Sequence, residues 1–221
     1  MAGGHRGLLA AIVGTFLALG GTALIVVAMA SQQHAPQPPA SVAGSIGPPP
    51  SASHASPTST VAPLVLPRSD PVAIDIPAIG VHSSLLYLGL NSDGTVQVPS
   101  GPSYNYNKAG WYRYSPTPGS VGPAVILGHV DSGAWGPSVF FELGDLRPGN
   151  RVMVSRRDGL VAVFEITGVR RYPKDHFPTQ LVYGNTKTAA LRLITCGGAF
   201  NFSTGHYVDN IIVFASLVGS R

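Results

Sequence analysis

Apolar residues form one long run near the start of the chain and several short runs in its second half. The long run, Gly7–Ala30, contains no charged residue, and it is long enough for a helix that crosses about 30 Å of hydrocarbon. We therefore predict a transmembrane anchor at residues 7–30. Arg6 lies on its N-terminal side, which predicts a cytoplasmic stretch 1–6 and an extracytoplasmic remainder. Because Ala28-Met29-Ala30 resembles a signal-peptide cleavage site, a cleaved signal peptide is the alternative.

Residues 31–67 differ in composition from both neighbouring parts of the chain. They consist largely of Pro, Ser, Ala, Gln and Gly, and they show no hydrophobic periodicity. Such segments do not form a packed core. We predict a linker that acts as a passive spacer and reaches on the order of 110 Å if it is mostly polyproline-II.

From residue 68 to residue 221, short β-branched runs alternate with turn residues. These runs are PVAIDIP, TVQVP, PAVILGHV, NRVMVS, LVAVFEITGV, ALRLITC and NIIVFASLV. Gly, Pro, Asn and Asp separate them, which is typical of an all-β barrel or sandwich. The stretch 138–143 could form one or two helical turns. The sequence therefore predicts a mainly β domain at residues 68–221.

Charge excludes some classes of function. Charged residues make up 11% of the chain, against about 25% in a typical soluble domain. The net charge is +4, but the basic residues are scattered rather than gathered in a stripe, so we do not expect nucleic-acid binding.

Cys196 is the only cysteine, so an internal disulfide is impossible. It ends the apolar run ALRLITC and precedes Gly197-Gly198, where the backbone allows a ligand to approach closely. We interpret Cys196 as a nucleophile, because a lone thiol on an exported protein is unusual. The alternative is a buried structural cysteine.

A nucleophilic cysteine needs a neighbouring base. Three of the seven histidines lie before residue 68; the other four are His82, His129, His176 and His206. His129 is the best partner because it also lies at a strand end, in PAVILGHV, and His206 is second because it closely follows the cysteine. We expect no metal site and no cofactor, since metal-ligand, serine-hydrolase and nucleotide-binding motifs are absent from the sequence.

The residues from about Val72 to Leu217 resemble the sortases, the cysteine transpeptidases of Gram-positive bacterial surfaces. The pieces VAIDIPAIGV, ILGHVDS, FFELGDLRPGNRVMV, RLITC and DNIIVFASL occur in the family's order. CGGAF and HYVDN look most like the actinobacterial sortases often grouped as class F.

The resemblance implies an eight-stranded β-barrel with short helices, following the membrane anchor. Cys196 would attack an LPXTG-like sorting signal and form a thioester, and an amine of a cell-wall precursor or protein would resolve it. His129 would be the general acid and base.

One feature of the family is missing. Sortases usually carry an arginine on the last strand, where this chain has Asn210, and the family's T-L-x-T-C becomes RLITC with Arg192 first. Residues 192 and 196 share one face of a strand. Arg192 or Asn210 would then replace the arginine at the substrate or oxyanion, or Arg192 would only shield the groove rim. The alternative function is a tethered, non-catalytic binding domain for cell wall or protein.

Overall fold

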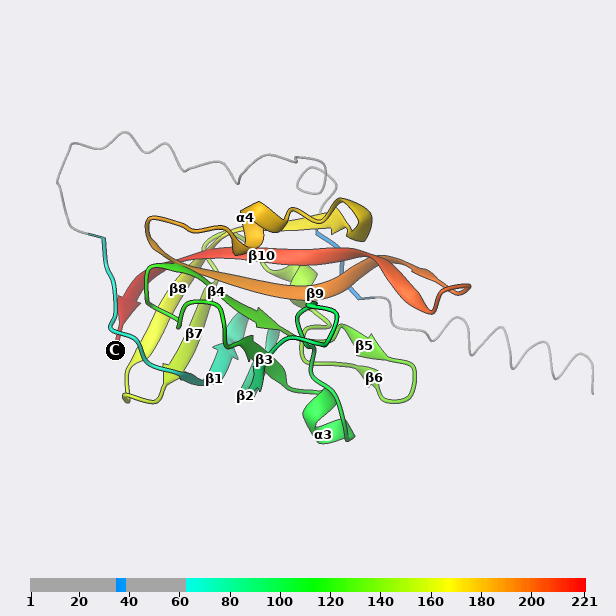
Figure 1. Ribbon diagram of the computed structural model, residues 1–221, viewed down its shortest axis with the longest axis horizontal. Coiled ribbons are helices and arrows are strands. Elements are labelled where there is room, and N and C mark those ends of the chain that lie inside the picture. Colours follow the sequence, from blue (N-terminus) through cyan, green and yellow to red (C-terminus); the bar gives the residue numbers. More distant parts are fainter. Residues whose placement is uncertain (1–34, 39–62) are drawn as a thin grey trace, which may run out of the picture. The chain divides into compact units, whose positions relative to one another are not determined.

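A computed structural model of the chain describes residues 35–38 and 63–221, and these residues form a closed eight-stranded barrel (Figure 1). Its strands are β1 (Pro71–Ile76), β2 (Val81–Leu88), β3 (Ala109–Tyr112), β4 (Gly122–Leu127), β7 (Arg151–Arg156), β8 (Val161–Pro173), β9 (Ala189–Asn201) and β10 (His206–Ser220). The order around the barrel is β1-β2-β3-β4-β9-β10-β8-β7. The predicted mainly β fold is therefore confirmed.

Short elements connect the barrel strands. They are the 3-10 turns η1 (Pro77–Ile79), η2 (Leu143–Asp145) and η3 (Lys174–His176), the helices α3 (Ser103–Tyr106) and α4 (Thr179–Tyr183), and the small hairpin of β5 (Asp131–Ser132) and β6 (Gly136–Pro137). In the stretch 138–143, residues 139–142 form turns and Leu143 begins η2, so no α-helix forms there. Within the described residues, no helix is long and apolar enough to cross a membrane. The predicted anchor lies outside the described residues.

Alternation along the strands divides the core into two layers. Ile74 and Ile76 of β1 and Val152 and Val154 of β7 point into the barrel and are buried there. All six residues of β4 are buried, because both of its faces are covered. Inside the barrel, Trp111, Phe140, Phe164, Leu191 and Leu193 belong to one apolar cluster drawn from all eight strands. The interior is thus a packed apolar core, so a functional site is expected at the ends of the barrel or on its outer face.

A second apolar cluster lies on the outer face of β4, β9, β10 and β8. It contains Leu88, Val125, Leu127, Tyr172, Val182, Ile194, Ile212 and Phe214. Val182 comes from α4, which lies along β10 in Figure 1. The segment 174–183 therefore covers this outer face.

The predicted strand at TVQVP is wrong, because residues 95–99 make only an isolated bridge, Leu90 to Val96. Conversely, β2 and β3 were not among the predicted strands. β3 has only four residues, and its pairing with β2 is parallel, so it depends on contacts distant in sequence.

The linker prediction concerns mostly residues outside the described ones, but two of its parts are described. Leu66 is buried in the barrel core and its N–H donates to the Gly119 carbonyl, 2.8 Å away. Near β9, the Gly198 N–H donates to Oε1 of Gln37 over 2.8 Å. Residues 35–38 and 66 therefore contact the folded domain.

Candidate active site

Two parallel strands bring His129 and Cys196 to the same place. β4 pairs with β9 with Leu127 opposite Ile194, and the Gly128 N–H continues the ladder by donating to the Ile194 carbonyl. His129 and Cys196 each lie two residues beyond this last pair, at the same end of the two parallel strands. Both residues are half-buried, so the pair is shielded yet reachable.

The other three histidines of the domain lie elsewhere. His82 is exposed and its Nδ1 lies 3.2 Å from Asp75, while His176 is exposed on η3 beside Asp175. His206 lies opposite Asn201, out along the β9–β10 hairpin and exposed. His206 lies four residues before Asn210, which pairs with Cys196 across the strands. This separation is about 13 Å along the strand.

Two groups contact the His129 imidazole, and a third packs on one of them. Its Nε2 lies 2.7 Å from the Pro99 carbonyl oxygen. Tyr106, at the end of α3, stacks on the imidazole with ring centroids 3.8 Å apart and an interplanar angle of 2°. Trp135 lies edge-on to the other ring of that stack, 5.1 Å from Tyr106. The imidazole is thus held in its plane and along one edge.

Asp131 connects the histidine loop to the hairpin that carries the cysteine. Its backbone carbonyl accepts a 3.1 Å hydrogen bond from the Tyr106 hydroxyl. Its Oδ2 accepts a hydrogen bond from the hydroxyl of Tyr207 on β10, 2.5 Å away, and hydrogen bonds to a carboxylate are stronger than those between neutral groups. The carboxylate therefore bridges two chain segments.

Burial and negative charge act together on these two phenols. The pKa of Tyr207 is raised by burial, by its hydrogen bond to Asp131 and by the nearby charges of Asp131 and Cys196. The pKa of Tyr106 is raised by burial, Asp131 and Cys196, in that order. Both phenols are therefore neutral donors at ordinary pH, close to the thiol.

Asn210 is the direct cross-strand neighbour of Cys196. β10 places it between Cys196 on β9 and Tyr172 on β8, so the three side chains share one face. Asn210 thus lies next to the thiol, and its amide carries N–H donors.

Arg192 lies on this same outer face but is buried rather than at a rim. It is 7% exposed, its guanidinium stands 4.7 Å over the Phe214 ring, and its Nη1 donates to the Leu191 carbonyl. Burial lowers the pKa of Arg192 to about 10, so it remains a cation at neutral pH.

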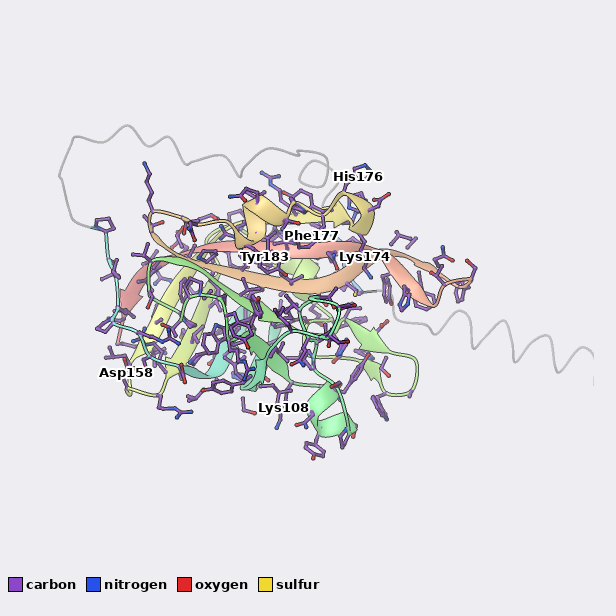
Figure 2. All side chains as sticks on the ribbon, viewed as in Figure 1. Lys108, Asp158, Lys174, His176, Phe177 and Tyr183 are labelled. Atoms are coloured by element: carbon purple, nitrogen blue, oxygen red, sulfur yellow. The ribbon has the colours of Figure 1, made fainter. Side chains whose placement is uncertain are left out.

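Arg170 is a second buried arginine on that face, and sequence analysis did not single it out. It is 6% exposed and lies opposite Ile212 on β10, two residues from Tyr172. Strand geometry puts its Cα about 12 Å from that of Cys196. Figure 2 shows Phe177 and Tyr183 on the segment 174–183 that covers this face.

Sequence analysis also missed Tyr106, Asp131 and Tyr207 as site residues. Asp131 and Tyr207 stand in the pieces ILGHVDS and HYVDN, which mark the resemblance, so their positions were signalled without a role. Tyr106 lies in a polar loop with no such signal. In the part of the chain that the structure describes, no group of three or more His, Cys, Asp or Glu side chains is placed to hold a metal ion.

Comparison with known proteins identifies the family. The sortase domain model matches residues 74–218, which is more than half of the chain, so the chain belongs to the sortase family. Members of this family are cysteine transpeptidases. No curated protein sequence matches the chain.

Solved sortase structures share the fold. Sortase A of Listeria monocytogenes matches with a TM-score of 0.51 and 16% identity, over 68% of this chain and 89% of that one. Sortase C-1 of Actinomyces oris matches with 0.51 and 20% identity, over 68% and 76%. The pilus-related sortase C of Group B Streptococcus gives 0.51 and 14%, over 71% and 70%. At these identities the likeness shows the barrel alone.

Proposed function

We propose that this chain is a sortase-type cysteine transpeptidase that cleaves an LPXTG-like sorting signal and transfers the acyl group to an amine of the cell envelope. The observation that supports the proposal is the parallel β4–β9 pairing, whose last pair lies two residues before both His129 and Cys196 within a sortase domain. Cys196 is the nucleophile and His129 the general acid and base.

In the first half of the reaction, the Cys196 thiolate attacks the carbonyl carbon of the Thr–Gly peptide bond. The C–N bond breaks as the leaving amine takes a proton from the His129 imidazolium, and a thioester remains. In the second half, the incoming amine gives a proton to His129 and attacks the thioester. The C–S bond then breaks, and the thiolate is restored.

The oxyanion and the peptide need hydrogen-bond donors near the thiol. Asn210 is suited to the oxyanion, because it lies directly across from Cys196. Arg192 and Arg170 are suited to the peptide, because they are buried on the same face farther from the thiol. Cleavage rates of Arg192→Ala and Asn210→Ala variants test this division. Near-normal rates in both would remove these two residues from the site.

The cellular setting is part of the proposal. A retained anchor at residues 7–30 and the linker 31–67 would hold the domain outside a bacterial membrane, with the N-terminus in the cytoplasm. The motifs CGGAF and HYVDN favour an actinobacterial, class F type of sortase. Surface proteins would be the substrates, and a cell-wall precursor or protein amine the acceptor.

The test uses the full chain in detergent micelles with a quenched LPXTG peptide and an added amine. We expect peptide cleavage and an amine-linked product, both lost in Cys196→Ala. A product formed only with water would indicate a peptidase instead. No cleavage and no thioester in the wild-type chain would contradict the proposal.

A specific observation favours one alternative. The barrel has Asn210 rather than an arginine opposite the nucleophile, which would suit a tethered domain that binds wall polymer or protein without catalysis. Such a domain would retain peptide in a binding assay with both wild-type and Cys196→Ala chains, and it would form no thioester.

A further inference from the structure

The surroundings of His129 specify which ring nitrogen carries the proton. The Pro99 carbonyl oxygen, 2.7 Å from Nε2, has no proton to donate. Nε2 must therefore be the donor, and in a neutral imidazole Nδ1 is then the acceptor. Among residues 35–38 and 63–221, no side chain or backbone group hydrogen-bonds Nδ1. Nδ1 is thus the nitrogen left to exchange a proton.

The hydrogen bond from Nε2 does not by itself fix the plane of the ring, because an imidazole can rotate about a single N–H···O axis. The Tyr106 ring removes this freedom by lying parallel to the imidazole at 3.8 Å. The Tyr106 hydroxyl is in turn held by the Asp131 carbonyl, two residues from the histidine. Tyr106 therefore orients Nδ1.

A separate contact sets the spacing between the two catalytic strands. The β4–β9 register ends at Leu127 and Ile194, so beyond these residues the backbone ladder no longer defines the distance between the two segments. There the 2.5 Å hydrogen bond from Tyr207 to Asp131 joins the histidine loop to the cysteine hairpin. No carboxylate touches the imidazole in the described residues, so Asp131 acts on the loop rather than on the ring.

We propose that Tyr106, Asp131 and Tyr207 are positioning residues for His129. Tyr106 holds the ring with its Nε2–H tautomer on the Pro99 carbonyl, and Asp131–Tyr207 holds that ring at its distance from Cys196. Their effect on catalysis rests on the proposed transpeptidase function. Their effect on the imidazole does not.

The first experiment measures the tautomer directly. Imidazole ¹⁵N shifts of His129 are recorded by NMR on the full chain in micelles, assigned with a His129→Gln variant. We expect the Nε2–H form in the wild type and in Tyr106→Phe, and a mixture of tautomers or averaged shifts in Tyr106→Leu. Tyr104→Leu is the matched control, since Tyr104 is on the same helix but 65% exposed.

The second experiment measures transfer kinetics in the same variants. Loss of the stack in Tyr106→Leu should lower kcat roughly tenfold to a hundredfold, the size expected for a misplaced catalytic group, with KM nearly unchanged. Tyr106→Phe, which keeps the ring, should recover most of that loss. Unchanged shifts and unchanged kcat in Tyr106→Leu would overturn the role of Tyr106.

The Asp131–Tyr207 contact is tested by a double-mutant cycle. Asp131→Ala and Tyr207→Phe should each lower kcat, and the double variant should be no worse than the poorer single one, because both remove the same bond. Additive losses would overturn the proposed contact. If the wild type shows the Nε2–H tautomer but no cysteine-dependent cleavage, the proposed function fails while the placement of His129 stands.

Discussion

Replacing Arg156 with methionine should destabilise the domain at the point where the linker joins the barrel. The Arg156 side chain is fully buried. Its guanidinium donates to the carbonyl oxygens of Pro67 and Pro118, each 2.6 Å away, and it pairs through two nitrogens with Asp158. Figure 2 shows Asp158 at the turn between β7 and β8. One side chain thus ties together three separate segments.

The size of the effect follows from what methionine leaves behind. The Pro118 carbonyl is buried, and an unsatisfied buried acceptor costs about 1–3 kcal/mol. Pro67 is exposed, so water replaces much of what its carbonyl loses, and the partly exposed Asp158 adds little. We expect a loss of about 1–3 kcal/mol in the free energy of unfolding. For a domain of this size that lowers Tm by roughly 2–12 °C.

Thermal unfolding of the full chain in micelles, followed by near-UV circular dichroism, measures this change. Arg157→Met is the matched control, because Arg157 is the next residue and is exposed. Its Tm should stay close to that of the wild type. A shift below about 2 °C in Arg156→Met, or an equal shift in both variants, would show that the buried guanidinium does not stabilise the junction.

Two further predictions concern the same domain. The Arg156 hydrogen bond lowers the pKa of Asp158, so this pair stabilises the fold above the usual carboxyl pKa and less as pH falls through the lowered one. From pH 6 to pH 2, the Tm gap between the wild type and Arg156→Met should narrow without closing, because the hydrogen bond to Pro118 does not titrate; a constant gap would contradict this. In Gly144→Ala, the new Cβ would overlap the Pro36 carbonyl oxygen, so residues 35–38 should detach. The Gly198 amide, which donates to Gln37, should then exchange its hydrogen at least roughly tenfold faster, as measured by mass spectrometry. Unchanged exchange would show that the segment stays bound.

Several features of the protein were available from the sequence because they depend on local patterns. Short β-branched runs between turn residues identify β7, β8 and β10. The position of His129 just after β4, which ends at Leu127, follows from where its apolar run stops. The same reasoning was wrong for Cys196, because β9 continues past it to Asn201 through its pairing with β10. The order of the motifs was enough to indicate the sortase family.

Tertiary structure decided how the strand ends meet and what surrounds them. The parallel pairing of β4 with β9 joins residues almost seventy positions apart, and no local pattern encodes such a partner. The same holds for Tyr106, which lies in a polar stretch of sequence and stacks on His129 through a contact between segments distant along the chain. Arg170 was missed for a related reason, because charge in a sequence suggests exposure, whereas this arginine is buried.

The sequence by itself shows Cys196 as the only thiol of the chain, placed where an apolar run meets two glycines. Its chemistry depends on the fold. The barrel supplies the histidine beside it, the asparagine across from it and the carboxylate that links their segments. The sequence specifies which residue stands at each position, but the long-range pairing of strands determines which residues become its neighbours in space.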